Sequence, residues 1–166
     1  MMMRPNDLLA LNLVMEAGLE PDDGKAAIAR VVKNRMARKY ESDGTISGTV
    51  LKRDQFSWAW FDFVESHSGT SVHGHSAKKY VQVCYSDADA LARAEGLLAR
   101  QPLPALVHCR DIGARVFAET YRGADYDRLT DDAVLYLNPR IVSDMPDWAA
   151  ADKLICSIGR HDFYRA

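Results

Sequence analysis

The sequence predicts an α+β protein, a mostly α-helical single domain with a small antiparallel β element near its C-terminus. Three observations carry this prediction. Apolar residues recur at helical spacing between residues 8 and 36, the β-prone segments lie after residue 133, and no linker, repeat or low-complexity tract divides the chain. With 166 residues and 48% hydrophobic content, residues 1–166 have the length and composition of one globular domain.

The first two helices are expected to form a hairpin. Asn6 or Asp7 can cap the first helix, and Gly18 can end it in the left-handed conformation. Pro21 and the two aspartates after it are typical of a helix start, because proline suits the first turn and acids suit the positive end of the dipole. Lys25 is predicted to face water. The inner face of the second helix is predicted from its apolar residues, Ile28, Val31, Val32 and Met36.

The middle of the chain gives less regular signals. Residues 45–51 fit a short helix or a strand, which periodicity does not separate. Residues 66–75 are rich in Ser, Gly and His and predict an exposed polar loop. A long helix is predicted over residues 80–100, with Ser86 or Asp87 as its N-cap. Later, residues 134–138 and 153–164 are β-prone and are expected to pair antiparallel.

The charge balance and the chain start limit the classes of partner. With 21 basic and 23 acidic residues, the formal net charge is −2, and no basic tract indicates a nucleic-acid partner. No apolar run approaches the roughly 18 residues that a membrane span needs. The segment from Met1 to Pro5 lacks the layout of a signal peptide, so we expect a chain made in the cytoplasm. We further expect a monomer.

The three cysteines, Cys84, Cys109 and Cys156, are widely spaced and form no C-x-x-C pair. Buried free thiols are the favoured interpretation, and one disulfide with one leftover thiol stays open. A structural zinc site is not expected, and neither a bound metal nor a cofactor is predicted.

Glu16 is the candidate general acid. It lies beside the apolar stripe of the first helix, where one helix ends and the next turns back. Apolar surroundings raise the pKa of a carboxyl toward neutrality, as glycoside cleavage requires. Hydrolysis would also need a second carboxylate at a fixed separation, and Glu20 is four residues further on. Gly18 and Pro21 argue against one continuous helix face for the two acids, and an ordinary surface glutamate is the simpler interpretation of Glu16.

The stretch from Gln55 to Phe63 contains five aromatic residues. Ring faces can cover the apolar faces of sugars, so Phe56 and Trp58 could line a sugar-binding groove. Gln55 and Ser57 alternate with the rings and could add hydrogen bonds to a sugar. Core packing explains the same aromatic residues equally simply, because Trp and Phe dominate protein cores as well.

Histidines offer a second, weaker candidate site. His73 and His75 have the spacing of two metal ligands, but no third ligand stands at a diagnostic offset, so a solvated loop is the default interpretation. His161, near the C-terminal strand, is interpreted as a hydrogen-bonded structural residue rather than a base.

Five blocks of the sequence, taken in order, resemble the SleB-type cell wall hydrolases, the family of spore cortex-lytic enzymes and related phage lysins. Residues 16–21 (E-A-G-L-E-P) are similar to the family's E-A-R-G-E-P motif, and residues 24–36 to its G-Q-x-A-V-A-x-V-x-x-N-R-V helix. Residues 45–58 resemble its I-x-G-V-x-x-x-x-Q-F-S-W block, and residues 135–139 and 158–164 its closing Y-x-N-P and I-G-x-H-x-F-Y segments.

Two departures from the family pattern stand out. Gly18-Leu19 replaces the Arg-Gly of the motif, and residues 67–132 find no match and look like an insertion.

The resemblance implies a lysozyme-like fold that cleaves peptidoglycan glycan strands between N-acetylmuramic acid and N-acetylglucosamine. It also implies a lytic transglycosylase route, in which the C6 hydroxyl of the muramic acid attacks the anomeric carbon and one glutamate, Glu16, serves as acid and then base. Carried over by position, the substrate-binding candidates are Asn34, Gln55, Phe56, Ser57, Trp58, Tyr136, Asn138 and His161.

Two other hypotheses stay open at this stage. One is a zinc-dependent peptidoglycan peptidase that uses His73 and His75. The other is a non-catalytic cell-wall-binding component of a virion. Because no signal peptide is recognised, a phage or prophage lysin that acts on the cell wall, in the periplasm or outside the cell, is the expected setting.

Overall fold

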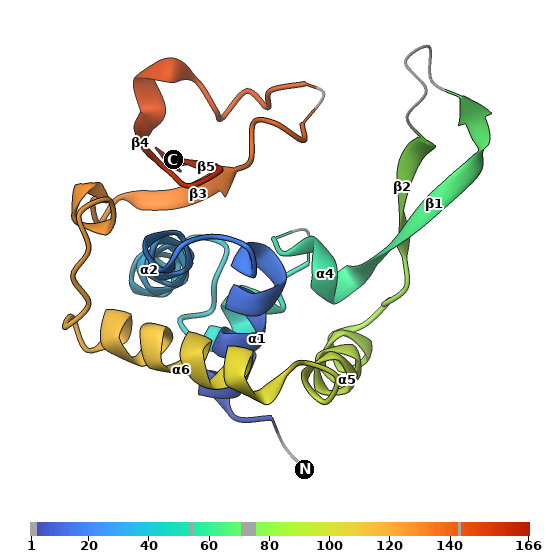
Figure 1. Cartoon of the computed structure of the whole chain (residues 1–166), viewed down its shortest axis with the longest axis horizontal. Coiled ribbons are helices and arrows are strands. Elements are labelled where there is room, and N and C mark those ends of the chain that lie inside the picture. The colour runs from blue at the N-terminus through green and yellow to red at the C-terminus, as the bar shows by residue number, and fades with distance from the viewer. Residues whose placement is uncertain (1–2, 54, 71–75, 143) are drawn as a thin grey trace.

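Two consecutive helices, α1 and α2, form the predicted hairpin, and the remaining elements pack around them (Figure 1). The computed structural model describes residues 3–53, 55–70, 76–142 and 144–166, with residues 63–70 and 76–80 described by their backbone alone. Within these residues the elements are α1 (Pro5–Ala17), α2 (Asp22–Arg38), α3 (Ile46–Val50), α4 (Ser57–Trp60), β1 (Phe61–Thr70), β2 (Ser76–Gln82), α5 (Asp87–Leu98), α6 (Leu103–Phe117), η1 (Tyr126–Arg128), β3 (Ala133–Leu137), η2 (Ala151–Lys153), β4 (Leu154–Ile158) and β5 (His161–Arg165).

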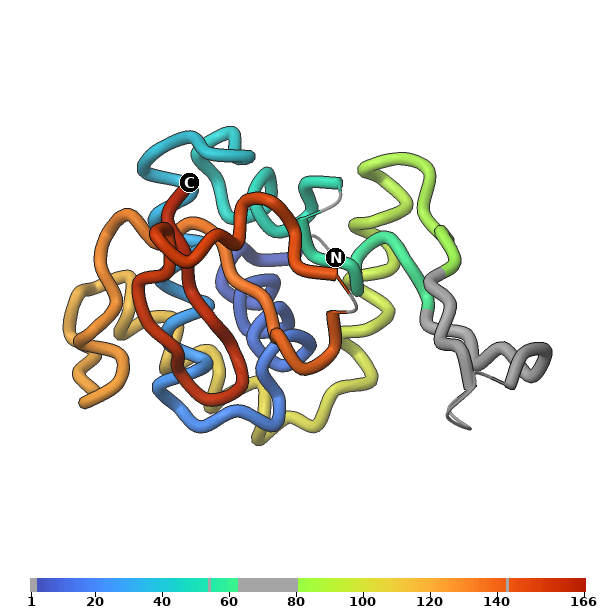
Figure 2. Tube along the Cα trace, turned by 90° about the horizontal axis from the view of Figure 1, so that it is seen from above, coloured from blue at the N-terminus to red at the C-terminus, as the bar shows by residue number. Residues whose placement is uncertain are grey.

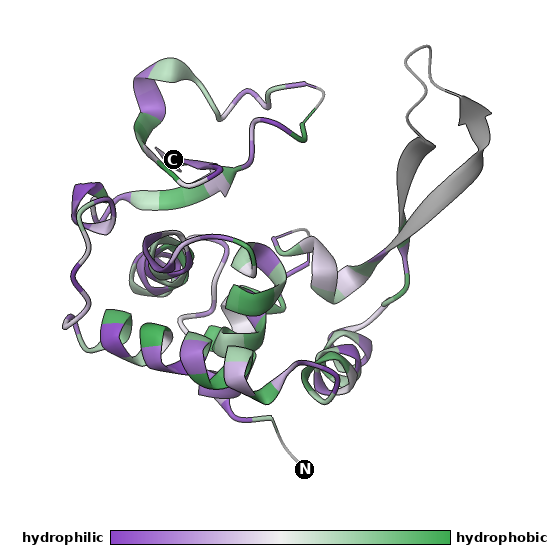
Figure 3. Ribbon diagram, in the orientation of Figure 1, coloured by the Kyte–Doolittle hydropathy of each residue, from purple (hydrophilic) through white to green (hydrophobic). Residues whose placement is uncertain are grey.

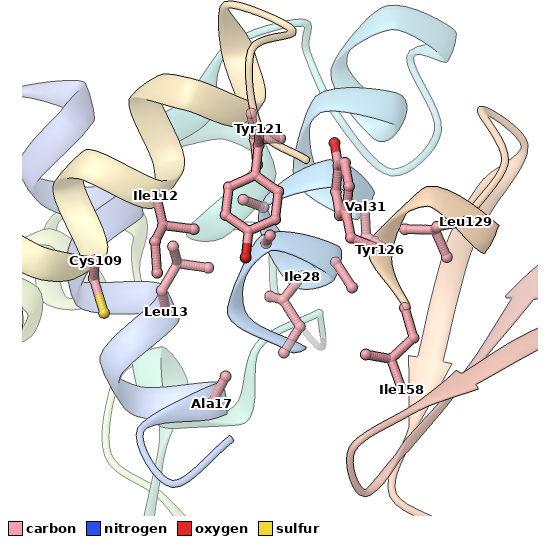
Figure 4. Close-up of a cluster of buried hydrophobic side chains, with 14 of the residues drawn as sticks. Leu13, Ala17, Ile28, Val31, Cys109, Ile112, Tyr121, Tyr126, Leu129 and Ile158 are labelled. Carbon is pink, nitrogen blue, oxygen red and sulfur yellow. The ribbon is translucent and has the colours of Figure 1, made fainter. Parts of the chain in front are cut away.

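Helix α1 is buried on most of its circumference and contributes to two apolar clusters. Leu13 and Ala17 pack with residues of α2 and α6 in one cluster, which Figure 4 shows with Ile28 and Ile112. Leu8 and Leu11 belong to the other cluster, with residues of α3, α4 and α5. The single apolar stripe predicted for α1 is therefore too narrow.

Helix α6 covers the hairpin from one side and shows the amphipathic pattern of a surface helix. Its buried residues, Leu106, Cys109, Ile112, Gly113 and Val116, recur three or four positions apart. Hydrophobic and hydrophilic residues alternate around the helix in Figure 3. This helix lies inside the segment 67–132 that resembled an insertion, yet it closes the core against α1 and α2.

The C-terminal strands form a three-stranded antiparallel sheet in the order β3-β5-β4, which confirms the predicted β element. Ile158 is opposite His161, so only Gly159 and Arg160 connect β4 to β5. Gly159 has a φ of 62°, the left-handed conformation that glycine adopts readily. In Figure 2 the chain from β3 to the C-terminus lies across the helical body, over α1 and α2.

The prediction for residues 66–100 needs correction. Strands β1 and β2 pair as an antiparallel hairpin, with Phe61 opposite Gln82, and this hairpin extends away from the helices (Figure 1). The predicted loop at 66–75 is therefore strand as far as Thr70, and its remainder lies outside the described residues. The predicted helix starts late, at Asp87, where Ser86 accepts a hydrogen bond from the Asp89 amide as its N-cap. Helical spacing in α5 had been extended into a segment that pairs as a strand.

The ends of the hairpin helices also differ from prediction. Arg4 occupies the N-cap of α1, without a side-chain cap bond, and Asp7 instead accepts from Arg4 Nε at 2.9 Å. Gly18 is right-handed (φ −53°, ψ −35°), so α1 does not end in the left-handed conformation. Lys25 is buried, and its Nζ donates to the backbone oxygen of Glu20 rather than facing water.

The other composition-based predictions fare as follows. Cys84, Cys109 and Cys156 are buried free thiols, as favoured. Residues 45–51 resolve as the short helix α3, with the Thr45 side chain accepting from the Gly48 amide. Of the helices in the described ranges, none combines the length and apolarity needed to cross a bilayer.

Candidate active site

A cleft of about 450 Å³ opens where the end of α1 meets α2, α4 and the sheet. Its lining includes six of the predicted site residues, Glu16, Gln55, Ser57, Tyr136, Asn138 and His161. The lining also contains Arg35, Phe61, Ile141 and Val142, which the sequence interpretation did not select. Segments more than 100 residues apart in sequence are thus brought together around Glu16.

Glu16 lies in the last turn of α1 and is partly buried at the cleft wall. Its Oε2 accepts a hydrogen bond of 2.8 Å from the Tyr136 hydroxyl. Burial raises the pKa of Glu16, while the Tyr136 hydrogen bond and the charge of Arg35 oppose that rise without cancelling it. Glu16 is therefore a carboxyl that holds its proton at higher pH than an ordinary glutamate, which suits a general acid.

Tyr136 is held in place by the sheet. It is opposite Phe163 in the β3–β5 pairing, and the two rings stack at 5.8 Å. Its ring also contacts His161 at 5.4 Å and Phe56 at 6.5 Å. Burial and the neighbouring Glu16 raise the pKa of Tyr136 well above its usual value. The phenol therefore stays protonated and remains a hydrogen-bond donor to Glu16.

Arg35 reaches the same cleft from α2. Its side chain is buried, its Nε donates to the Val134 carbonyl at 2.6 Å, and its guanidinium lies 5.5 Å from the centre of the Phe56 ring. The sequence signal that could have identified Arg35 is its place in the 24–36 block, directly after the candidate Asn34. An arginine at the end of a solvated helix face was the simpler expectation there.

Glu20, the other carboxylate of the first motif, is in a different environment. Its Oε2 accepts from the Arg160 backbone N–H at 2.9 Å and its Oε1 from Arg160 Nε at 2.6 Å. Burial alone would raise the pKa of Glu20, but the two bonds from Arg160 outweigh it and leave the pKa below its usual value. Glu20 is not among the residues that line the cleft, and it ties the α1–α2 turn to the β4–β5 turn.

Three predicted substrate-binding residues lie behind the cleft lining instead of in it. Asn34 donates from Nδ2 to the Ala133 carbonyl at 2.9 Å, which joins α2 to β3. Trp58 is buried and donates from Nε1 to Asn12 Oδ1 at 2.9 Å. Phe56 is buried beneath Tyr136 and Arg35. For these aromatic rings the structure favours core packing, the alternative left open by the sequence.

His161 begins β5 and is buried at the cleft, where its Nδ1 has no hydrogen-bond partner. Burial lowers the pKa of His161, which favours the neutral imidazole. The metal-binding hypothesis falls on His73 and His75, which lie outside the described residues. In the remainder of the chain, as far as the structure describes it, no three His, Cys, Asp or Glu side chains gather as a metal site.

The chemistry available here is proton transfer by a single carboxyl. Among the described residues that line the cleft, Glu16 is the one carboxylate, because Glu20 is engaged elsewhere. Tyr136 orients the Glu16 side chain, and polar side chains from Gln55 and Asn138 flank it.

Comparison with known proteins gives one family and one similar fold. Residues 19–164 match a family described as Cell Wall Hydrolase; the matched range begins beyond Glu16 and includes the other residues of the cleft. No curated protein matches the chain. Among solved structures, the catalytic domain of the germination-specific lytic transglycosylase SleB from Bacillus anthracis is similar, with a TM-score of 0.58 and 17% identity over 97% of this chain and 93% of that chain.

Proposed function

Because the chain belongs to the cell wall hydrolase family, we propose that it cleaves peptidoglycan glycan strands between N-acetylmuramic acid and N-acetylglucosamine, with Glu16 as the acid–base residue. The observation that carries the proposal is the Glu16 carboxyl itself. It lies in a cleft, its pKa is raised by burial, and a Tyr136 hydroxyl holds it at 2.8 Å.

The first step is proton donation to the leaving group. The O–H bond of Glu16 breaks as its proton passes to the glycosidic oxygen, and the bond from that oxygen to the anomeric carbon of the muramic acid breaks with it. Glu16 becomes a carboxylate, and the electron pair of the broken bond stays on the departing glucosamine oxygen. The hydrogen bond from Tyr136 stabilises the carboxylate that is formed.

The second step is attack by the C6 hydroxyl of the same muramic acid. This hydroxyl forms a bond to the anomeric carbon and passes its proton to the Glu16 carboxylate, which restores the acid. Hydrolysis by retention or inversion needs two carboxyl groups, about 5–5.5 Å or about 6.5–9.5 Å apart. One carboxylate among the described lining residues supports the internal attack, because a nucleophile within the substrate needs no second carboxylate to hold it.

Mass spectrometry of the muropeptides released from purified cell wall tests the proposal. We expect 1,6-anhydromuramic ends from the wild-type protein and a loss of about 10³-fold or more in their release from E16Q. Glutamine keeps an oxygen that accepts from Tyr136, so the variant should fold normally. Reducing muramic ends would contradict the transglycosylase route, and unchanged release from E16Q would contradict the role of Glu16.

The substrate implies action on the cell wall. The expectation of a phage or prophage lysin stays a prediction, as does the zinc-dependent peptidase that would use His73 and His75. A digest repeated with a metal chelator separates that peptidase from the proposed enzyme, since Glu16 chemistry requires no metal.

A further inference from the structure

Arg35 is a buried cation whose only hydrogen-bond partner is neutral, within the part of the chain that the structure describes. Its side chain is 4% exposed, Nε donates to the Val134 carbonyl, and Nη1 is buried without a partner. None of the ion pairs among the described residues includes Arg35. A guanidinium stays protonated in proteins, so its positive charge is permanent. Burying a charge without a counter-ion is costly, which calls for an explanation from function.

The surroundings of Arg35 leave Glu16 as the group that can acquire the matching charge. The titratable groups that act on the two side chains are Tyr136 from β3, and Tyr40 and Glu41 from the segment after α2. His161 from β5 shares the cleft, and burial favours its neutral form.

The other groups near Arg35 do not supply a compensating charge. Tyr136 stays protonated, and Glu41 is an exposed residue whose Oε2 lies 3.7 Å from Lys52 Nζ. Of the groups that line the cleft with Arg35, Glu16 is the one that becomes negative during the proposed reaction.

We propose that Arg35 is a positioning residue whose fixed positive charge holds the Glu16 carboxylate that forms when the proton passes to the glycosidic oxygen. This inference rests on the proposed role of Glu16. With Glu16 protonated, Arg35 has no counter-ion; once the proton has left, a carboxylate and a guanidinium share one cleft. An interaction that strengthens only as charge develops lowers the barrier rather than the substrate affinity.

The same geometry balances the two steps. Burial keeps the proton on Glu16 until substrate is bound, while the charge of Arg35 makes that proton easier to release. The Nε bond to Val134 and the Phe56 ring fix the guanidinium before the reaction begins, so little reorganisation accompanies charge formation.

The pH profile of kcat/KM for anhydromuropeptide release tests the inference. The active form carries the proton on Glu16, so activity falls as pH rises through the Glu16 pKa. In R35Q the loss of a positive charge raises that pKa, and we expect the alkaline limb to move up by about one pH unit. We also expect kcat to fall about 10-fold to 100-fold with KM within about threefold. R35K keeps the charge and should keep the limb near its wild-type position.

Asn34→Ala is the matched structural control. Asn34 joins α2 to the same strand through the Ala133 carbonyl but carries no charge. We expect N34A to lower the melting temperature without moving the limb. A folded R35Q whose limb coincides with that of the wild type would overturn the inference, because Arg35 would then act only as packing.

A second measurement does not depend on how R35Q folds. We expect the Arg35 side-chain ¹⁵N resonances and the Glu16 carboxyl ¹³C resonance of the wild-type protein to titrate with one midpoint, and this Arg35 titration to vanish in E16Q. Arg35 resonances indifferent to the ionisation of Glu16 would overturn the inference alone. Wild-type protein that releases no anhydro ends would overturn the proposed function and the inference with it.

Discussion

Glu16 and Glu20 stand at the two sides of one helical turn and differ in almost every physical respect. Glu16 faces a cleft, accepts one hydrogen bond from a neutral phenol, and has a raised pKa. Glu20 is paired through both carboxylate oxygens with Arg160 and has a lowered pKa. The residue type is the same, so the difference in pKa comes from the partners that the fold supplies to each side chain.

The backbone between the two acids produces this separation. Helix α1 ends at Ala17 and α2 begins at Asp22, so Glu16 and Glu20 do not share one helix face. The Glu20 backbone N–H donates to the Ala17 carbonyl at 2.9 Å, which closes the turn. Glu20 is thereby directed to the β4–β5 turn, whereas Glu16 stays with α1 and meets β3.

The two acids contribute to stability with opposite dependence on pH. Because the folded pKa of Glu16 is raised, its contribution is most favourable below the unfolded pKa and is lost as pH rises through the folded value. Because the folded pKa of Glu20 is lowered, its contribution is present above the unfolded pKa and is lost as pH falls through the folded value. Above the ordinary glutamate range, Glu20 therefore supports the fold while Glu16 weakens it.

Replacing each acid by glutamine gives the largest contrast. We expect E16Q to lose about 10³-fold or more of its activity while its melting temperature at neutral pH is unchanged or higher. E20Q should keep activity within about threefold below its melting temperature but lose about 3 kcal/mol of unfolding free energy. That value is at the low end for a buried pair, because the Arg160 side chain is 42% exposed whereas that of Glu20 is 2% exposed.

Activity assays and denaturant unfolding of the two variants at one temperature check this contrast. An E20Q protein that is stable but inactive would place Glu20 in the chemistry and remove the distinction between the two acids.

Gly159→Ala acts on the Glu20 side alone and should have a smaller effect. A Cβ at Gly159 would overlap Glu20 Oε2, and φ is 62°, where an L side chain is strained. We expect a loss of about 2 kcal/mol, with the acid limb of the stability curve shifted because the Glu20–Arg160 pair is displaced. Gly96→Ala in α5 is the control, since nothing lies within 4 Å of its added Cβ and helix propensity favours alanine. Equal stability of the two variants would contradict the close packing of Gly159 on Glu20.

The sequence was sufficient for the elements whose signals are local. Helical spacing located α2, the β-prone segments located β3, β4 and β5, and the motif at residues 16–21 identified a carboxyl that lines a cleft. It was insufficient where a tertiary partner decides. Residues 80–82 have enough apolar character for a helix, but pairing with β1 makes them strand.

The partners of charged residues were the least predictable part of the site. Arg160 is 140 positions from Glu20, and Val134 is 99 positions from Arg35, so no spacing rule in the chain connects them. Asn34, Phe56 and Trp58 lie in the matching blocks but form the support behind the cleft, because their polar atoms or rings are already satisfied by the core. A motif therefore identified the neighbourhood of the site, and burial decided which members reach the cleft.

Tyr136→Phe makes the smallest change that sharpens the comparison, because it removes one oxygen from the Glu16 side and leaves the ring contacts with Phe163 and His161. The lost hydrogen bond had lowered the Glu16 pKa, so that pKa should rise and the alkaline limb of kcat/KM should move up by less than one unit. Activity should fall about tenfold, since the carboxylate formed on proton transfer loses one donor. Tyr164→Phe removes a hydroxyl from the same sheet away from the cleft lining and should leave the limb in place. A limb that moves down in Y136F would show that the phenol favours the protonated acid, and the opposition between Glu16 and Glu20 would then rest on burial alone.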